Sequence, residues 1–378
     1  MILQFGAGNF LRAFADLIVH QLNLITKDSL GDIVVVQSTG KERADAINAA
    51  NGNYHVAIQG FQDGNTIDET IEVTSIGRAL HAGSQWSKVL EMGRDPELQI
   101  VFSNTTEAGF TLDPADATYN GAVPGSFPAK LLEVLTERMQ AGQPAPWIVP
   151  CELIESNADR LRELVLEQAT FWNASEDLKL WLTNECRWVN TLVDRIVPGP
   201  PKDHKLLGID PLLLSAEPFC FWAVETDDSN FPLAHHPEVV AAPDITSYTL
   251  RKVRILNGAH SALVSRAIGT PEVETVRDCL DHPELRPWLE KLLFEEIVPV
   301  LEGRCDDPAG FARATLDRFR NPFLEHQLSA IALNHESKVA IRLQPTLKEF
   351  RERFNKEPPL LGELLGPACA SQTSSKME

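Results

Sequence analysis

Residues 2–14, ILQFGAGNFLRAF, are the most informative segment for the fold, because they place two glycines between an apolar strand and a helix. ILQF predicts a short buried strand, and apolar side chains recur at helical spacing after Gly8. In a dinucleotide-binding fold, the backbone of such a turn approaches a pyrophosphate at the helix N-terminus. Leu11 stands where the fingerprint has its third glycine, so the motif alone is weak. A tight turn without a ligand is the alternative.

Further strands follow the pattern of a parallel sheet. DIVVV (32–36) is a continuous β-branched run, which is typical of a buried parallel strand. The apolar stretches 98–109 and 147–156 read as strands that end in polar loops. Strands of this kind alternate with helical patterns. The alternation predicts an α/β fold with a Rossmann-like, doubly wound parallel sheet.

The helices and turns between these strands are also predicted. Residues 6–23 read as one helical stretch after the glycines, and Ser84 is a candidate N-cap for a helix to residue 92. A long helix is expected from residue 156 or 157 to Leu182. The pair Asp63-Gly64 between two strand-like segments predicts a hairpin.

The character of the chain changes at about residue 245, where helical patterns punctuated by proline and glycine take over. Helices are expected over 247–268, 271–282, 284–302, 308–320, 322–335 and 338–354. We therefore predict a dinucleotide-binding domain over 1–245 and an all-helical substrate and catalytic domain over 246–365. The polar residues 366–378 predict a disordered tail.

Composition narrows the class of protein. The chain has 378 residues and a net charge of −19, which argues against nucleic acid and anionic membranes as partners. No signal sequence and no run of 18 uncharged apolar residues is visible, so we expect a cytoplasmic protein. The six cysteines include no C-x-x-C pair, which indicates reduced thiols rather than disulfides or a metal site.

The residues that would contact a dinucleotide lie at the ends of the predicted strands. Gln37 occupies the place where an acidic residue would hold the adenosine ribose. NAD could bind through Gln37, whereas Lys41 and Arg43 leave NADP open. SNTTEAG (103–109) ends another strand and points to the same crevice. The predicted contacts are Gly6, Gly8, Asn9, Phe10, Gln37, Ser103, Asn104 and Thr105.

RKVRILNGAH (251–260) raises a separate question. At about 100° per residue, an α-helix places Lys252, Asn257 and His260 on the half of the wheel that also carries its leucines. Buried polar groups cost free energy unless they are paired. Taken singly, each residue has an ordinary explanation: a solvated cap, a turn and a satisfied interior histidine.

Six segments, read together, carry a resemblance. They are QFGAGNFLRAF, VFSNTTEAGF, PCELIESNADRLRELVL, NTLVDRIVPG, KVRILNGAHSALV and RFRNPFLEHQLSAIALN, in this order. Over about residues 1–350 the chain resembles the long-chain mannitol dehydrogenase family. NTTEAG and PCELI are most similar to its tagaturonate reductase (altronate oxidoreductase) branch.

The resemblance implies an activity and a set of catalytic residues. It implies metal-independent, NAD-dependent hydride transfer that interconverts D-tagaturonate and D-altronate. The family's lysine, asparagine and histidine match Lys252, Asn257 and His260, and a separate asparagine matches Asn190. Lys252 would be the general acid and base, with its pKa lowered by desolvation and by neighbouring arginines. The two asparagines would donate hydrogen bonds to the developing oxyanion.

A sugar acid also needs a partner for its carboxylate, and arginine is the natural bidentate choice. Arg318 and Arg320 in RFRNP are candidates, as is Arg254, although the helical wheel points Arg254 away. His326 and Lys338 are weaker candidates. The ordinary alternative for each arginine is a solvated charge on a helix surface.

Two other functions stay open. The chain is also compatible with another polyol or uronate dehydrogenase, of the mannonate or mannitol type. The resemblance implies that relatives have residues before the first strand. It also implies that they continue after the RFRNP segment for roughly a further hundred residues of helix, a length comparable to a small domain. A shortened relative that binds nucleotide or sugar acid without turnover is therefore the third hypothesis. The sequence leaves the oligomeric state open, with a monomer favoured.

Overall fold

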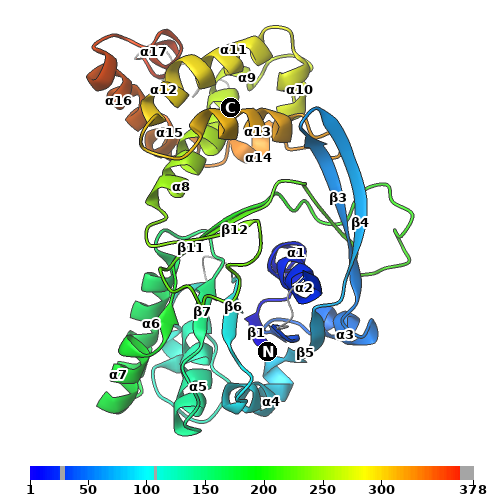
Figure 1. Cartoon of the computed structure of the whole chain (residues 1–378), viewed down its shortest axis with the longest axis vertical. Helices are drawn as coiled ribbons and strands as arrows, with labels where there is room; N and C mark the ends of the chain where they lie inside the picture. The colour runs from blue at the N-terminus through cyan, green and yellow to red at the C-terminus, as the bar shows by residue number, and fades with distance from the viewer. Residues whose placement is uncertain (26–29, 106–108, 367–378) are drawn as a thin grey trace. The chain divides into compact units, whose positions relative to one another are not determined.

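The structure is a computed structural model that describes residues 1–25, 30–105 and 109–366 (Figure 1). The predictions for residues 106–108 and for the tail from residue 367 lie outside the described residues. The chain divides into two compact units. The first unit comprises Met1–Ala57, Thr70–Ala216 and Cys220–Ile245, and the second comprises Ile58–Glu69, Glu217–Phe219 and the residues from Thr246 onward.

The first unit is built on a six-stranded sheet with the order β5-β2-β1-β6-β7-β8, in which all neighbours pair in parallel. The strands are β1 (Ile2–Phe5), β2 (Ile33–Gln37), β5 (Ile76–His81), β6 (Ile100–Ser103), β7 (Trp147–Pro150) and β8 (Arg187–Trp188). This is the predicted Rossmann-like sheet, so that prediction is confirmed. The strand order reverses between β1 and β6, the place where such sheets bind ligands.

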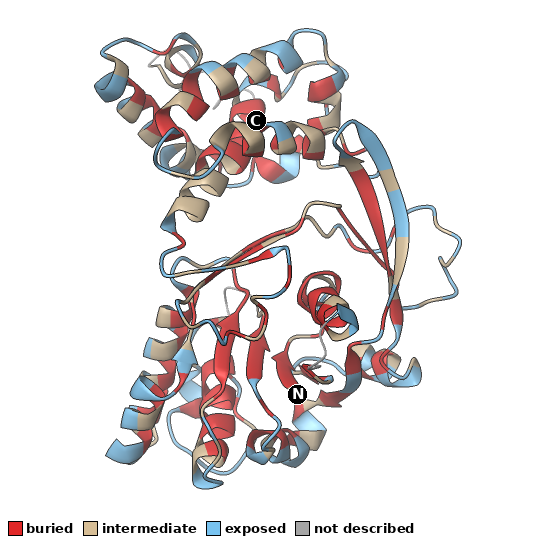
Figure 2. Ribbon diagram, viewed as in Figure 1, coloured by how far each residue is buried: buried red, intermediate tan, exposed pale blue. Residues whose placement is uncertain are grey.

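Helices and a small sheet bury this sheet. The helices are α1 (Asn9–Ala13), α2 (Ala15–Ile25), α3 (Glu42–Ala49), α4 (Ala82–Arg94), α5 (Phe127–Gln140), α6 (Asn157–Phe171) and α7 (Glu176–Asn184). One core joins sheet residues such as Val101 and Ile148 to Leu131 of α5. Figure 2 shows buried residues along β6 and β7. Elsewhere Trp222 contacts Phe14, with ring centroids 5.0 Å apart.

Two three-stranded sheets complete the strands. One has the order β12-β11-β9, from Val239–Ala242, Phe221–Glu225 and Thr191–Asp194. The other has the order β10-β3-β4, from Leu214–Ala216, Tyr54–Gln62 and Asn65–Val73. Asp63 and Gly64 both have positive φ, at 50° and 80°, as a two-residue hairpin turn requires. The predicted hairpin is confirmed.

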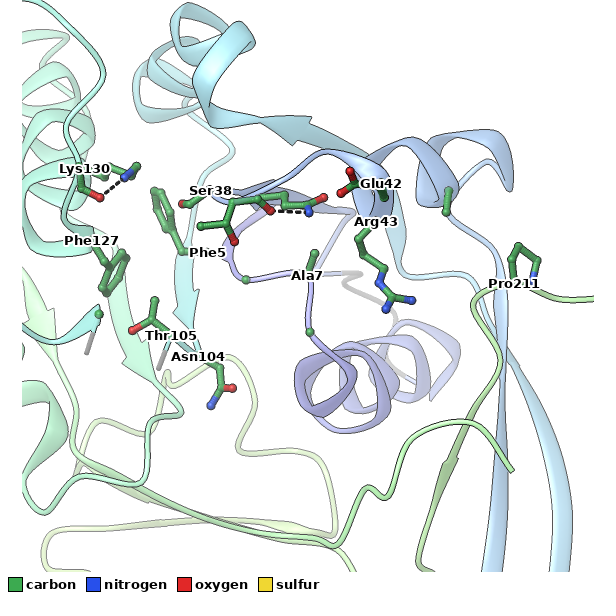
Figure 3. Close-up of a pocket in the computed structure, with 17 residues that line it drawn as sticks. Phe5, Ala7, Ser38, Glu42, Arg43, Asn104, Thr105, Phe127, Lys130 and Pro211 are labelled. Atoms are coloured by element: carbon green, nitrogen blue, oxygen red, sulfur yellow. Dashed lines mark hydrogen bonds between the residues drawn. The ribbon is translucent and has the colours of Figure 1, made fainter. Parts of the chain in front are cut away.

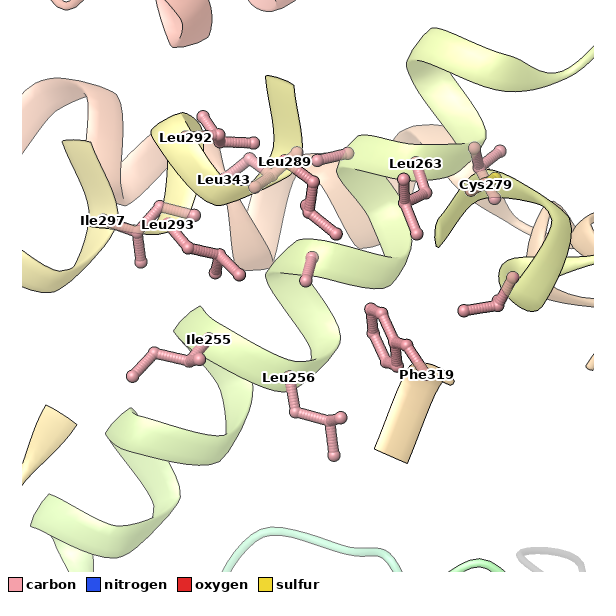
Figure 4. Packing of buried hydrophobic residues seen from close by; sticks show 14 of the residues in the cluster. Ile255, Leu256, Leu263, Cys279, Leu289, Leu292, Leu293, Ile297, Phe319 and Leu343 are labelled. Atoms are coloured by element: carbon pink, nitrogen blue, oxygen red, sulfur yellow. The ribbon is translucent and has the colours of Figure 1, made fainter. Parts of the chain in front are cut away.

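The second unit is helical apart from the hairpin tip and the segment Glu217–Phe219, as predicted. Its helices are α8 (Thr246–Arg251), η3 (Lys252–Asn257), α9 (Gly258–Ala267), α10 (Val276–Asp281), α11 (Leu285–Lys291), η4 (Leu292–Ile297), α12 (Val298–Leu301), α13 (Pro308–Phe319), α14 (Leu328–Ile331), α15 (His335–Arg342), α16 (Gln344–Phe354) and α17 (Pro359–Leu365). Figure 4 shows Ile255, Leu256 and Leu263 along the central helix, with Phe319 beside it.

Several predicted helix boundaries are wrong, for local reasons. Helix α4 begins at Ala82, before Ser84, and the Ser84 hydroxyl instead lies 2.9 Å from His81 Nδ1. The helix expected to run to Leu182 ends at Phe171, because Asn173 adopts a left-handed conformation with φ of 51°. At Asn173, the turn between α6 and α7 thus overrode the apolar periodicity that predicted one long helix.

The other errors concern helix continuity. The single stretch expected after the glycines breaks at Phe14, between α1 and α2. Of the helix expected over 322–335, only α14 forms. The helix expected over 338–354 is divided into α15 and α16, because Pro345 lies in the first turn of α16 and cannot continue α15.

Candidate active site

A cavity of about 750 Å³ lies where the sheet order reverses (Figure 3). The loops that follow β1, β2 and β6 and the start of α5 enclose it. Of the eight residues predicted to contact a dinucleotide, five line the cavity: Gly6, Gly8, Gln37, Asn104 and Thr105. The strand ends therefore meet at one crevice, as the alternation of strands and helices implied.

Glycine is suited to the two positions in the first loop for different structural reasons. Gly6 has φ of 130°, and a Cβ there would lie 3.0 Å from the Asn104 carbonyl oxygen and 3.2 Å from Leu11 Cδ1. Gly8 has an ordinary φ of −70°, and a Cβ there would meet no atom within 4 Å. The backbone at Gly8 thus borders open space, and the missing side chain lets a ligand approach that backbone closely. Leu11 fills the core against Gly6 in place of the third glycine.

The other three predicted contacts do not line the cavity. Asn9 accepts a hydrogen bond from Arg12 Nη2 at 2.9 Å. The Phe10 ring stacks on Phe14 at 5.0 Å. Ser103 is buried, and its hydroxyl donates to Glu152 Oε2 at 3.0 Å. These residues support the loops rather than face the cavity.

The loop that follows β2 carries both signs of charge. The Gln37 side chain is engaged: its Nε2 donates to the Thr39 carbonyl at 2.7 Å and its Oε1 accepts from Ala44 N at 2.7 Å. Glu42 lines the cavity, and hydrogen bonds from its own N–H and that of Lys41 lower the pKa of its carboxyl. Arg43 also lines the cavity and points away from Glu42 (Figure 3).

Glu152 holds the wall formed by the loop after β6. Its Oε1 accepts from Thr105 N at 2.8 Å, in addition to the Ser103 bond. Burial raises the pKa of Glu152, and these donors oppose that effect. Glu152 lies in the PCELI segment, and no role was predicted for it from the sequence. Its position directly after a buried strand was the one sequence signal that could have indicated a functional carboxylate.

The start of α5 supplies a further wall that the sequence did not indicate. Phe127 and Lys130 line the cavity, and Lys130 Nζ donates to the Gly125 carbonyl at 2.6 Å. Burial lowers the pKa of Lys130. The irregular residues before α5 carry no strand or helix pattern, so nothing in the sequence placed them beside the glycine loop.

The predicted catalytic helix is not a regular α-helix. Residues Lys252–Asn257 form a π-helical segment between α8 and α9, with i→i+5 hydrogen bonding. The α-helical wheel separated Lys252 and Asn257 by about 140°. The wider π turn reduces this separation, because residues five apart lie about one turn apart. Single π turns inside helices occur frequently at functional sites.

Asn257 and His260 present polar atoms that the described residues leave unpaired. No described residue makes a hydrogen bond to the half-buried Asn257 carboxamide, and buried His260 Nε2 likewise has no partner. The His260 ring contacts Phe319 at 4.4 Å and His326 at 4.9 Å. Burial, followed by His326, lowers the pKa of His260 well below its ordinary value. The imidazole is therefore neutral near pH 7.

Asn190 belongs to the first unit and is fully bonded. Its Oδ1 accepts from Ala158 N and Asp159 N, at 3.0 and 3.1 Å, and so caps α6. Its Nδ2 donates to Asp159 Oδ2 at 2.9 Å and to Glu225 Oε2 at 2.7 Å. Its donor hydrogens already have carboxylate partners within the first unit.

The three predicted substrate arginines have distinct surroundings. Buried Arg318 forms a bidentate pair with Glu217, at 2.8 and 2.9 Å. Arg254 donates to Glu349 at 3.1 Å and to Thr346 at 2.8 Å. The Arg320 guanidinium instead lies over the Phe61 ring, 4.4 Å from its centroid. Two of the three are thus engaged with carboxylates inside the second unit.

In the described ranges, none of the helices is long and apolar enough to cross a membrane. No set of three or more histidine, cysteine, aspartate or glutamate side chains there is arranged to hold a metal ion.

A parallel sheet with a glycine loop at its switch point, followed by a helical unit, defines a dinucleotide-binding class of enzyme fold. Residues 1–235 match the mannitol dehydrogenase Rossmann domain, and residues 244–370 match the mannitol dehydrogenase C-terminal domain. The chain belongs to the mannitol dehydrogenase family, which makes it an oxidoreductase of sugar acids or polyols.

Individual relatives agree with this assignment. The chain is 38% identical over 376 residues to altronate oxidoreductase of Bacillus subtilis (strain 168), covering 95% of this chain and 77% of that one. It is 39% identical over 361 residues to altronate oxidoreductase of Escherichia coli O7:K1, covering 92% and 74%.

Solved structures share the fold. Substrate-free D-sorbitol dehydrogenase superposes with a TM-score of 0.82 at 24% identity, covering 96% of this chain and 78% of that one. Pseudomonas fluorescens mannitol 2-dehydrogenase, solved with NAD and D-mannitol, superposes with a TM-score of 0.76 at 22% identity, covering 96% and 77%.

Proposed function

We propose that the protein is an NAD-dependent oxidoreductase that interconverts D-tagaturonate and D-altronate. The observation that carries the proposal is the block Lys252–His260, which combines a lysine, an unpaired carboxamide and an unpaired buried imidazole on one π-bulged helix. The relatives of Bacillus subtilis and Escherichia coli, at 38% and 39% identity, are named altronate oxidoreductase. Their names support the choice of a sugar acid over other substrates of the family.

The cavity beside the glycine loop fits the cofactor. When bound, a nicotinamide cofactor supplies or accepts the hydride, and the chain must hold it and handle the proton. Gly8 leaves space for a pyrophosphate, and the walls at Asn104 and Thr105 are fixed by Glu152. The five-residue helix α1 adds only a short dipole, so we assign pyrophosphate binding mainly to the N–H groups of the loop.

The choice of NAD over NADP rests on Glu42. Its exposed carboxylate, ionised at neutral pH, lines the cavity next to the loop that follows β2. A negative charge there disfavours a 2′-phosphate and favours a ribose hydroxyl. Arg43 lines the same cavity and opposes this effect, so the measured preference reports which of the two side chains dominates.

Proton transfer is assigned to Lys252. In reduction the ammonium gives a proton to the carbonyl oxygen as it becomes an alkoxide, and in oxidation the amine accepts it from the alcohol. Asn257 donates a hydrogen bond to the same oxygen. Neutral His260 binds a substrate hydroxyl through Nε2, which satisfies an atom that otherwise has no partner. Asn190 positions Glu225 and α6, and it reaches substrate only by exchanging one of its carboxylate bonds.

The proposal is tested with the purified full chain. NADH and NADPH oxidation are followed with D-tagaturonate, D-fructuronate and D-fructose as acceptors. We expect NADH with D-tagaturonate to give the highest kcat/KM. A preference for uncharged ketoses would replace the proposal with a polyol dehydrogenase. NADH binding without turnover of any acceptor would instead indicate a relative that only binds.

A further inference from the structure

Arg342, the last residue of α15, lies next to the turn that carries the predicted catalytic residues. α15 runs antiparallel to α9. At one end His335 Nε2 lies 2.8 Å from Ser265 Oγ, and at the other Arg342 Nη1 donates to Ser261 Oγ at 3.2 Å. Ser261 directly follows His260. The Arg342 guanidinium therefore lies beside the polar block of the second unit.

Most of the hydrogen-bonding capacity of Arg342 is unused. Within the described ranges, Ser261 is its only hydrogen-bond partner and no carboxylate pairs with it. None of its nitrogens is among the buried atoms without a partner, so solvent reaches those that are unbonded. A guanidinium has five N–H donors in a planar fork that matches a carboxylate. This side chain can therefore accept a ligand without losing a protein ion pair.

The charge around Arg342 is unbalanced. Burial lowers the pKa of Arg342, and no acidic group acts to raise it, whereas Glu349 raises that of Arg254. Arg342 in turn lowers the pKa values of His260, His335 and Lys338. Glu336 is exposed, and it raises the pKa of His335 by less than Lys338 and Arg342 lower it. A half-buried cluster of this kind favours a bound anion.

We propose that Arg342 binds the carboxylate of the sugar acid and so makes the site prefer an acid to a neutral polyol. This inference rests on the proposed function, whose substrate it specifies. Of the arginines that the sequence suggested, Arg318 and Arg254 already hold carboxylates, and Arg320 lies over Phe61. The competing explanation is structural: Arg342 would only fasten α15 to α9 through Ser261.

The test compares D-altronate with D-altritol, which carries a neutral CH₂OH group in place of the carboxylate. Binding to the full chain is measured by calorimetry with saturating NADH. Because NADH is already reduced, it cannot accept a hydride from either alcohol, so the assay does not depend on turnover. We expect Arg342→Gln to weaken D-altronate binding about 10- to 100-fold, the usual effect of a charge-assisted bidentate contact. D-altritol binding should change less than about 3-fold, and Arg342→Lys should recover part of the affinity.

Ser261→Ala is the matched control, because it removes the protein contact of Arg342 and leaves the guanidinium in place. It should leave D-altronate affinity within about 3-fold of the parent. Equal losses for both ligands in Arg342→Gln, or a similar loss in Ser261→Ala, would overturn the inference in favour of the structural explanation. No preference of the parent protein for the acid would also overturn it. Arg342-dependent binding without turnover would support it while refuting the proposed catalysis.

Discussion

Among single residues, the unpaired Nε2 of His260 fits the proposed binding of a substrate hydroxyl. A buried donor or acceptor that lacks a partner costs about 1–3 kcal/mol. His260 Nε2 is such an atom in the part of the chain that the structure describes, and it lies on the helix that carries Lys252 and Asn257. Under the proposed function, a substrate hydroxyl bound to His260 Nε2 removes this cost.

Lys252 is expected to transfer the proton. Lys252→Ala should lower kcat about 100- to 10,000-fold, the usual contribution of a general acid–base group. NADH affinity, measured by fluorescence titration, should stay nearly constant. Lys252→Arg is the control, because arginine keeps the charge but does not deprotonate in proteins. Turnover of Lys252→Arg at the parent rate would show that only the positive charge matters.

Asp16 is expected to make stability depend on pH. It is fully buried, its Oδ2 accepts from Gln4 Nε2 at 3.3 Å, and burial raises its pKa from 3.8 to about 7. The folded state therefore binds the extra proton, and the contribution of Asp16 to stability falls as pH rises from about 4 to about 7. Above pH 7 the loss is complete.

Asp16→Asn should remove this penalty while keeping an acceptor for Gln4. Urea unfolding at pH 5 and pH 8 should show that the advantage of Asp16→Asn over the parent grows by ~2–3 kcal/mol between the two values. An advantage that is equal at both pH values would mean that Asp16 is already ionised in the folded protein at pH 5.

At the scale of elements, two local departures from regular geometry shape the site. The turn after β1 needs a positive φ at Gly6, and the helix after α8 widens into a π turn from Lys252 to Asn257. Neither strand nor helix periodicity encodes these departures. The first places Gly6 in the wall of the cavity, and the second narrows the angle around the helix between Lys252 and Asn257, the two residues proposed to act on the reacting oxygen.

The two glycines of the loop should respond differently to alanine. Gly6→Ala strains a left-handed φ and places Cβ 3.0 Å from the Asn104 carbonyl oxygen, so both the melting temperature and NADH affinity should fall. Gly8→Ala meets no protein atom, so NADH affinity should fall at an unchanged melting temperature. Differential scanning fluorimetry gives the melting temperatures of the two variants, and NADH titration gives their affinities for the cofactor. Unchanged NADH affinity in Gly8→Ala would place the pyrophosphate elsewhere.

At the scale of the whole molecule, the second unit recruits residues from distant parts of the sequence. Glu217 supplies the partner of buried Arg318, and the Gln59 carbonyl accepts from Asn321 Nδ2 at 3.1 Å. The helical unit therefore includes two short segments that precede residue 246. Its stability depends on chain connections that its own helices do not contain.

Breaking the Glu217–Arg318 pair should destabilise the protein strongly. Glu217→Gln leaves a buried guanidinium without its counter-ion, which costs about 3–5 kcal/mol, whereas replacing both partners costs far less. Urea unfolding should therefore show a large loss for Glu217→Gln and recovery in the double variant Glu217→Leu/Arg318→Met. A double variant no more stable than Glu217→Gln would mean that packing around Glu217, rather than charge, sets the loss.

From the amino-acid sequence alone it was possible to predict the strands β1, β2, β6 and β7 of the central sheet, the hairpin at Asp63-Gly64 and the five cavity residues at strand ends. Apolar periodicity and turn chemistry are local, and parallel strands place their ends at one edge. The partners of the polar side chains became known only from the folded structure. It paired Arg318 with Glu217 and Asn190 with Glu225, left Arg342 without a carboxylate, and brought Glu152 and Lys130 to the cavity. The reason is that ion pairing and burial depend on contacts between residues far apart in the chain, which no local pattern encodes.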